Sequence, residues 1–342
     1  MATIYKGYDT YILQAVETSF GAGSVITGTD DIGIVQSFTA TLNQNQMRVQ
    51  NMGEGRNAVN YVNLGLDVTG TIDLQMNQPT PLRFLVGAVE SGSGTQVDPL
   101  EIQEVDNIGF TGTTVPTVAL EVGSEGGAND DVMTFTGVAF NGGTLTATQG
   151  EIVTLSLNWT GKQGTSSTTL ETFSPSTEAP FTFVKALVKL GSDTWAEVVS
   201  YALIVENALF VYRSLGSNFI LTPVYGVRRY DWTIVMKKTV DATGGVLSAI
   251  EARELFFGLA SNTTSDDIAK FPSLDTLQLE ISEGDNSGNQ VLQVDLEQVQ
   301  ITSLSEPVDL LGGIVEMTMT GFGLAGLTDG AAKVPMRFFT RT

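Results

Sequence analysis

The feature that most constrains the fold of this chain is an internal repeat, in which one series of features from the first half recurs in the second. Residues 117–135 (TVALEVGSEGGANDDVMTF) and 276–294 (TLQLEISEGDNSGNQVLQV) share one order of features: an alternating segment, a Ser-Glu-Gly turn and a second alternating segment. The register continues through residues 155–161 (LSLNWTG) and 315–321 (VEMTMTG). Self-similarity at a fixed period is typical of a repeated structural unit. We therefore expect two copies of one module.

A helical signal and the charge distribution support the repeat. Residues 81–88 (PLRFLVGA) correspond to 252–259 (ARELFFGL), each upstream of its repeated segment. No Lys or Arg occurs within residues 84–161 or 271–332, and each interval holds ten acidic residues. The two copies therefore carry the same one-signed charge pattern in the same place.

The secondary-structure signal is mostly that of strands. Apolar and polar residues alternate over residues 64–76, and the same pattern recurs at 38–42, 118–122, 153–159, 277–281, 292–296 and 315–319. Alternation predicts strands with one buried and one polar face. Helices are expected only at residues 81–88 and 249–258, while the polar stretch 161–169 (GKQGTSSTT) is expected to be a loop. The fold class is therefore mainly β (α+β), with two tandem modules that each carry one short flanking helix.

Composition excludes several classes of site. The 342 residues include no Cys and no His, which rules out disulfides, Cys/His metal and haem sites, and Cys or Ser–His nucleophilic catalysis. The formal net charge of −21 has the wrong sign for electrostatic nucleic-acid binding. The longest apolar run is far shorter than a membrane span, so no membrane partner is expected. No cofactor is expected either.

The remaining candidate chemistry is weak. Carboxylates cluster at Asp98, Glu101, Glu104 and Asp106, but nothing sets the fixed separation that a glycosidase pair needs, and a solvated acidic face is the favoured interpretation. Residues 283–289 (EGDNSGN) lack the spacing of a calcium loop and fit a polar hairpin tip. The sequence therefore predicts no enzyme.

Several segments in order resemble a known family. They are residues 16–21 (VETSFG), 35–42 (VQSFTATL), 53–59 (GEGRNAV), 66–76 (LDVTGTIDLQM) and 82–88 (LRFLVGA). This order is similar to that of the tail tube proteins of long-tailed, siphovirus-like double-stranded DNA viruses. The resemblance covers most of residues 1–170 and recurs more weakly from about 181 to 327.

The resemblance implies an architecture and an assembly. Each module would be a β-sandwich or partly rolled barrel with a flanking helix. Family members usually carry one module and form six-subunit rings that stack into a hollow tube. Two modules per chain would then give a trimeric, pseudo-hexameric ring. The expected boundaries are an N-terminal arm (1–30), a first tube module (31–170), a linker (171–180), a second tube module (181–326) and a C-terminal arm (327–342).

The resemblance also suggests roles for individual residues. The polar face of the strand at 66–76 would line the lumen of the tube through Asp67, Thr69, Thr71, Asp73 and Gln75. Contacts between subunits or rings are expected at the unusually apolar termini and at three arginines: Tyr5, Tyr8, Tyr11, Arg56, Arg228, Arg229, Phe338 and Phe339. For the pair Arg228 and Arg229, a solvated surface pair and a salt bridge to a neighbouring module both remain open.

The expected function is that of a structural virion protein. The partners would be other copies of the chain, other tail proteins at the tube ends, and viral DNA that passes through the lumen without specific binding. The protein would lie in the virion tail and assemble in the host cytoplasm. Three alternatives remain: another β-rich virion or cell-surface binding module, for receptor binding or decoration, a carboxylate-based glycan hydrolase, and a secretion-system tube of related fold, although chains of that last class usually carry a single module.

Overall fold

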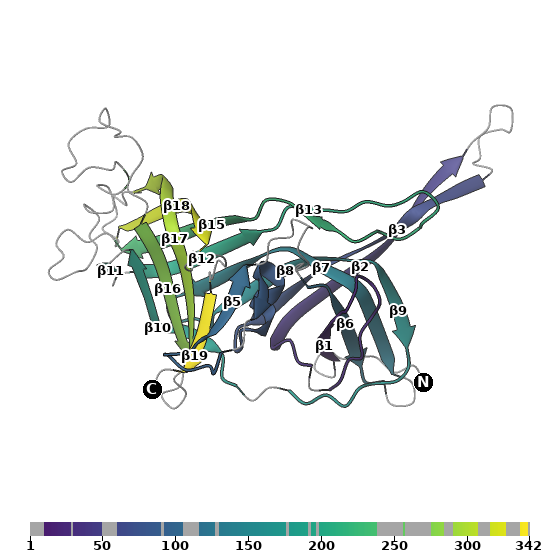
Figure 1. Ribbon diagram of the computed structural model, residues 1–342, viewed down its shortest axis with the longest axis horizontal. Coiled ribbons are helices and arrows are strands. Elements are labelled where there is room, and N and C mark those ends of the chain that lie inside the picture. The colour runs from purple at the N-terminus through teal and green to yellow at the C-terminus, as the bar shows by residue number, and fades with distance from the viewer. Residues whose placement is uncertain are drawn as a thin grey trace.

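The fold is seen in a computed structural model of the chain (Figure 1). The structure describes residues 10–28, 30–49, 60–89, 92–104, 116–126, 130–175, 178–190, 193–195, 198–237, 256, 275–283, 290–306, 315–325 and 336–340. This part of the chain is mainly β, as the alternation predicts. Within these ranges, no helix has the length and apolar character needed to cross a membrane.

The described part of the first half contains nine strands and one short helical segment. The strands are β1 (Thr10–Val16), β2 (Ile34–Val49), β3 (Asn60–Gln75), β4 (Gly87–Val89), β5 (Leu100–Glu104), β6 (Val118–Ser124), β7 (Asp131–Thr148), β8 (Thr154–Gly161) and β9 (Gln163–Ser167). A 3-10 turn (Thr80–Leu82) leads into α1 (Arg83–Val86). The helix expected at 81–88 is therefore present but shorter.

The described part of the second half contributes ten strands. They are β10 (Phe181–Leu190), β11 (Asp193–Trp195), β12 (Val198–Glu206), β13 (Leu209–Phe210), β14 (Val224–Tyr225), β15 (Arg229–Lys237), β16 (Asp275–Glu283), β17 (Gln290–Ser305), β18 (Glu316–Ala325) and β19 (Met336–Thr340). The helix expected at 249–258 lies outside the described residues except for Phe256, which is helical.

Six antiparallel strand pairings have counterparts in the two halves. In the first half β1 pairs with β6, β6 with β7, β7 with β8 and with β9, β8 with β3, and β3 with β2. In the second half β10 pairs with β16, β16 with β17, β17 with β18 and with β19, β18 with β15, and β15 with β12. The register also agrees, because Leu120 faces Phe135 and, at the equivalent place in the second half, Leu279 faces Val294.

One sequence-based expectation was wrong. Residues 161–169 were expected to form a loop, but residues 163–167 form strand β9 along β7. The stretch lacks apolar alternation because Thr165, Ser166 and Ser167 are exposed at the edge of the sheet. Gly164 packs close to Phe135, so the strand is selected by backbone pairing and close approach rather than by an apolar face.

Two strand pairings join the halves into one body. β12 pairs with β7, and β19 lies between β17 and β5. A buried ion pair adds to this junction: Arg228 Nη1 lies 3.1 Å from Glu104 Oε1. Asn207, also buried, donates to the carbonyl oxygens of Leu85 and Phe140 and accepts a hydrogen bond from Arg228 Nε at 2.7 Å. The halves therefore share hydrogen-bonded sheet and core.

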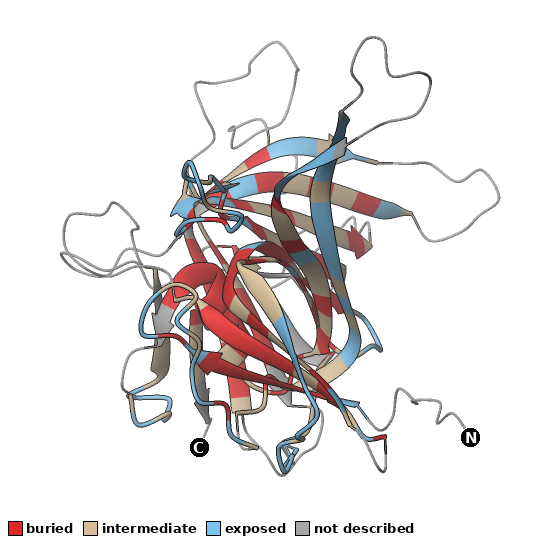
Figure 2. Cartoon of the chain, turned by 90° about the vertical axis from the view of Figure 1, so that its right-hand side faces the viewer, coloured by how far each residue is buried: buried red, intermediate tan, exposed pale blue. Residues whose placement is uncertain are grey.

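The core lies beneath this sheet and is covered by the flanking helix. Buried side chains from both halves form one continuous cluster, which appears as the red interior in Figure 2. α1 packs on β7, where Phe84 stacks on Phe140 with ring centroids 5.0 Å apart. Aromatic rings stacked in this way add to the stabilisation from burial.

Both expected arms contain strands of the sheet network. β1, within the expected arm 1–30, pairs with β6, and β19, within the expected arm 327–342, pairs with β17 and β5. Apolar residues of both segments therefore pack within the same chain.

Candidate functional site: an open polar sheet face

The candidate functional site is one face of a continuous eight-stranded sheet. The strands follow the spatial order β2–β3–β8–β7–β12–β15–β18–β17, and every neighbouring pair is antiparallel. Side chains alternate across each strand, so that one set packs into the core and the other set faces away from it. In β3, for example, Val68, Ile72 and Leu74 are fully buried.

The five residues expected to face a lumen lie together on the open side of β3. Thr69 is exposed, and Asp67, Thr71, Asp73 and Gln75 are partly exposed. Their cross-strand neighbours on the same face are also polar. These neighbours are Asn43, Thr41, Thr39 and Ser37 on β2, and Thr160, Asn158, Ser156 and Thr154 on β8.

The same face continues across the junction into the second half of the chain. Thr144 on β7 lies opposite Ser156 on one side and Ile204 of β12 on the other. Ile204 in turn lies opposite Asp231 of β15. The further open-face residues are Thr146, Thr148, Ser200, Ala202, Glu206, Arg229, Thr233, Val235, Lys237, Glu316, Thr318, Thr320, Phe322, Gln300, Ser303 and Ser305. Hydroxyl side chains therefore predominate along the whole face.

Hydrogen bonds hold the polar side chains of this face against the sheet. Ser37 Oγ donates to Asp73 Oδ2 at 2.5 Å, and Ser156 Oγ donates to Asp73 Oδ1 at 2.7 Å. These two bonds, the one from Ser37 foremost, lower the pKa of Asp73, so its carboxylate is ionised at neutral pH. The hydroxyls of Thr39 and Thr71 lie 2.7 Å apart. Acceptors that are already used within the protein have less capacity to bind a passing ligand.

Asp67 is held differently. Burial raises the pKa of its carboxyl group, but hydrogen bonds from Asn45 and Arg213, together with the charge of Arg213, outweigh this effect and lower it overall. Arg213 forms an ion pair with Asp67, so this carboxylate is ionised and its charge is compensated.

Three further charges on this face lie close to one another. Arg229 lies 3.0 Å from Asp231 and 3.8 Å from Glu206. The face is therefore hydroxyl-rich with only a modest excess of negative charge, and most of the net charge of −21 must lie elsewhere in the chain.

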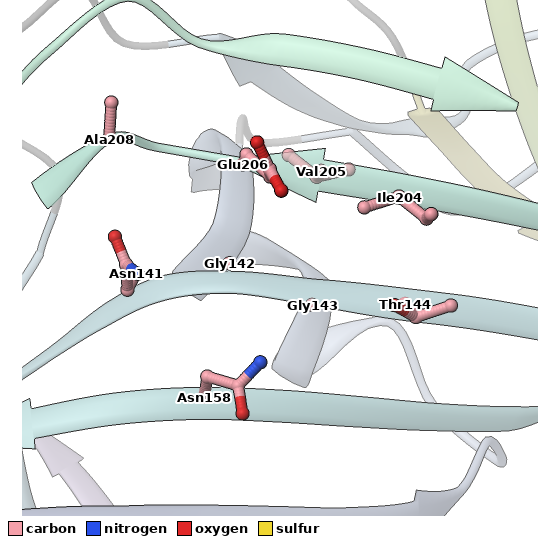
Figure 3. A pocket seen from close by; sticks show the side chains of 9 residues that line it. All are labelled: Asn141, Gly142, Gly143, Thr144, Asn158, Ile204, Val205, Glu206 and Ala208. Atoms are coloured by element: carbon pink, nitrogen blue, oxygen red, sulfur yellow. The ribbon is translucent and has the colours of Figure 1, made fainter.

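A hollow lies on this face next to the junction (Figure 3). Gly142 and Gly143 leave room there between Asn158 on one side and Glu206 on the other. Across the described residues, no group of three or more acidic side chains is placed to hold a metal ion.

The candidate contact residues lie in several environments. Tyr11 is buried in β1, where its hydroxyl donates to Glu121 at 2.9 Å and accepts from the Glu171 amide at 2.8 Å. Arg228 is buried in the junction with Glu104, whereas Arg229 is exposed.

The remaining candidates belong to the termini or to undescribed segments. Phe338 is half-buried and contacts Phe181 edge-on, and the backbone of Phe339 pairs with Val291 in the sheet. Tyr5, Tyr8 and Arg56 lie outside the described residues.

Sequence reasoning missed three polar anchors. Glu17 is buried and accepts hydrogen bonds from the amides of Gly21, Gly23 and Gly137 and from the hydroxyl of Thr117. Asn207 and Arg213 link the two halves. Gly21 and Gly23, which follow Glu17 closely in the sequence, were the available signal, because successive backbone amides at such positions can form a nest that binds a carboxylate.

A match to a known family agrees with the mainly β fold. A family model described as phage tail tube protein matches residues 7–298, which is most of the chain. A comparison with curated proteins gives no significant match. On the strength of the family match, together with the mainly β fold, this chain belongs to the phage tail tube protein family.

Proposed function

We propose that this protein assembles into stacked rings of three chains that form the hollow tail tube through which viral DNA passes. The observation that carries the proposal is the pairing of β7 with β12, which extends a sheet from the first half directly into the second. If the halves are two copies of one module, this junction is an internal example of the contact that closes a ring.

The repeated pairing pattern supports this interpretation. Six strand pairings have counterparts in the two halves. The pairs β6–β7 and β16–β17 also have the same register at the equivalent residues Leu120 and Leu279. Six module positions per ring would then need three chains. Fusing two modules makes alternate contacts intramolecular, which lowers the entropic cost of assembly.

The two edge strands of the open sheet would provide the contact between neighbouring chains of one ring. Within the described part of the chain, β2 pairs only with β3, so its outer edge carries unpaired backbone groups. At the far end of the sheet, the last residues of β17 pair only with β18 among the described strands. An exposed strand edge is a template for pairing with another chain. Closing β17 of one chain on β2 of the next would remove both edges.

The internal junction also predicts the register of this contact. Glu206 of β12 lies opposite Gly142 of β7, which lies opposite Asn158 of β8. In the repeat, where LSLNWTG corresponds to VEMTMTG, Asn158 is equivalent to Thr318. Thr318 lies opposite Ser305 of β17. Ser305 is therefore the residue of β17 that corresponds to Gly142.

The position on β2 follows in the same way. Ala40 shares a cross-strand row with Trp159, and Tyr201 shares one with Met319. The repeat makes Trp159 equivalent to Met319, so Ala40 of β2 corresponds to Tyr201 of β12. Counted along both strands from this pair, Asn45 corresponds to Glu206. We therefore expect Asn45 of one chain to lie beside Ser305 of the next.

The polar face supports the passage of DNA. In a closed ring it would form the wall of the lumen, where ionised Asp73 repels phosphate and the bonded hydroxyls offer few free donors. A wall with few cations releases few counterions from DNA, so it gives little attraction. DNA would slide past without specific binding.

The protein would act as a structural component of the virion tail. It would assemble in the host cytoplasm, with other tail proteins at the tube ends, and would not act as an enzyme.

Cysteine cross-linking tests the ring contact without interference from native thiols, because the chain has no Cys. In the double variant Asn45→Cys/Ser305→Cys, a short bismaleimide should give covalent species of up to three chains. The control pairs Asn45→Cys with Ser93→Cys, at an exposed loop position in the first half. Equal cross-linking of the control, or covalent species larger than trimers, would contradict the predicted contact.

Negative-stain microscopy at rising protein concentration separates the tube from its alternatives. Stacked rings support the tube, whereas monomers or unstacked trimers under all conditions would support a receptor-binding or decoration module. A glycan hydrolase would instead show turnover that is lost on mutation of two specific carboxylates.

A further inference from the structure

The connection between β12 and β15, residues 207–228, crosses the end of the sheet and reaches the base of the β2–β3 hairpin (Figure 1). It leaves β12 at Asn207 and Ala208, and the backbone of Ala208 has a φ of 44°. The short strands β13 and β14 then pair with each other. In the first half, the corresponding place between β2 and β3 is occupied by the hairpin itself.

Three interactions attach the connection to β3. Arg213 Nη2 donates to the carbonyl oxygen of Leu66 at 3.0 Å and forms an ion pair with Asp67. The amide of Leu66 donates to the carbonyl oxygen of Asn218 at 2.9 Å. Since β8 ends at Gly161, opposite Val68, it does not reach Leu66. The connection therefore satisfies the backbone groups of β3 just where its neighbouring strand stops.

The adjacent residue is suited to this close approach. Gly65 has a φ of 136°, and a Cβ atom added to it would lie 2.8 Å from Arg213 Nε. The hairpin register also shifts here, between Asn45 and Gln46. A bulge of this kind re-aims the strand beyond it, and the arginine lies against the bulged position.

Exposed apolar side chains gather on these two segments. Of the nineteen large hydrophobic residues that are exposed in the described part of the chain, thirteen belong to the hairpin or the connection. They are Leu42, Met47, Tyr61, Val62, Leu64, Phe210, Val211, Tyr212, Leu215, Phe219, Leu221, Val224 and Val227. Concentrated exposed apolar surface marks an interaction site.

We propose that the 207–228 connection is a brace that fixes the β2–β3 hairpin, and that the braced pair docks on a second copy of this chain in the next ring. The proposal rests on the proposed tube. Strands of a closed barrel tilt by about 35–45° from its axis, so segments that continue past the strand ends extend beyond the rim of the ring toward its neighbour.

Charge also favours another copy of the chain as the partner. The connection holds no Asp or Glu, although the chain has 38 acidic residues and a net charge of −21. Copies of such a chain repel one another over most of their surface. Contact is least opposed where acidic residues are absent, and that is where the apolar side chains lie.

The brace has a consequence for symmetry. Because the second-half connection is used to hold the first-half hairpin, each chain presents one docking surface rather than two. A ring of three chains then offers three axial contacts, not six, and successive rings stack in threefold register.

Removal of the arginine tests the brace. In Arg213→Ala, trimers should form as in the natural protein, but tubes should be at least tenfold shorter at the same protein concentration. The swap Asp67→Arg/Arg213→Asp should recover part of the length because it restores the ion pair. Lys189→Ala, which removes a partly exposed cation from β10, outside the eight-stranded sheet, should leave tube length unchanged. Full-length tubes from Arg213→Ala would overturn the proposal, as would six equivalent axial contacts in a reconstruction of the natural tube.

Hydrogen exchange separates failure of the brace from failure of the tube. The Leu66 amide should be protected in the natural protein and should exchange at least tenfold faster in Arg213→Ala. If the natural protein forms no rings, the proposed function fails and axial docking fails with it, but the Leu66 exchange rates still test the brace. Equal rates in the two proteins would overturn it.

Discussion

Trp159 packs its indole ring against Gly70 on the neighbouring strand, and a Cβ atom added to Gly70 would overlap both this ring and the carbonyl oxygen of Thr39. The second half repeats the relationship with the partners exchanged, because Trp232 of β15 packs against Gly321 of β18. Both tryptophans are only 2% exposed. At the centre of the core in each half, therefore, a tryptophan ring occupies the space left by a glycine on the neighbouring strand.

Gly70→Ala should destabilise the protein by about 3 kcal/mol, the upper end of the usual cost of overpacking, because the backbone of Thr39 cannot move aside as a side chain can. Gly321→Ala should behave similarly. Thermal unfolding followed by circular dichroism measures the change. Thr69→Ala, on the open face of the same strand, is the matched control and should shift the midpoint little. A Gly70→Ala protein as stable as the control would show that the core at Trp159 can relax.

Glu17→Gln should cost about 2–4 kcal/mol of stability, because a glutamine would direct an NH₂ group at donors and leave buried amides unpaired. The Glu17 carboxylate accepts three backbone amides at 2.9–3.1 Å and one hydroxyl at 2.9 Å. Urea unfolding should show the loss, whereas Glu151→Gln at an exposed site should not. If Glu17→Gln leaves the free energy of unfolding unchanged, water takes over the hydrogen bonds that the carboxylate accepts.

The buried pair Arg228 and Glu104 should show strong coupling. Both side chains are only 8% exposed, and Arg228 also donates to Asn207. Arg228→Met should destabilise by about 3–5 kcal/mol, because it leaves Glu104 charged and buried. The double variant Arg228→Met/Glu104→Gln should recover a clear part of that loss. A double-mutant cycle on the midpoint of unfolding measures the coupling, and additive effects would contradict it.

Tyr11 should give a pH dependence above pH 10. Burial and the adjoining carboxylates of Glu121 and Glu171 raise its pKa to about 12, although the bond from the Glu171 amide opposes this. The unfolded tyrosine ionises near 10, so the folded state binds the extra proton between pH 10 and 12. Stability from this group is complete below pH 10 and is lost as pH rises toward 12, by about 2–3 kcal/mol. Relative to the natural protein, Tyr11→Phe should lose less stability over this interval, and identical slopes would contradict the assignment.

Much of the fold follows from local pattern. The alternation at residues 64–76 predicted β3 and its polar face, because burial on one side imposes a period of two. The strand β9 was missed because it is selected by pairing with β7 rather than by apolar side chains. Arg213 was missed because it contacts β3 from the other half of the sequence, through a connection with no periodic signal. Both interactions depend on tertiary structure, and a short stretch of sequence carries no signal for them.

Lysines placed on the open face should slow the ejection of viral DNA. Thr69 on β3 and Thr41 on β2 are exposed cross-strand neighbours on this face, and neither lies in the core. In Thr41→Lys/Thr69→Lys, new cations in the lumen would attract phosphate and release counterions, which resists sliding. We expect ejection to slow several-fold at low salt and to recover as salt screens the charges. Dye-detected DNA release from virions carrying the variant measures the rate, and Thr41→Gln/Thr69→Gln controls for side-chain size. If the lysine and glutamine tubes eject DNA at the same rate at low salt, the sheet face does not act on DNA through its charge.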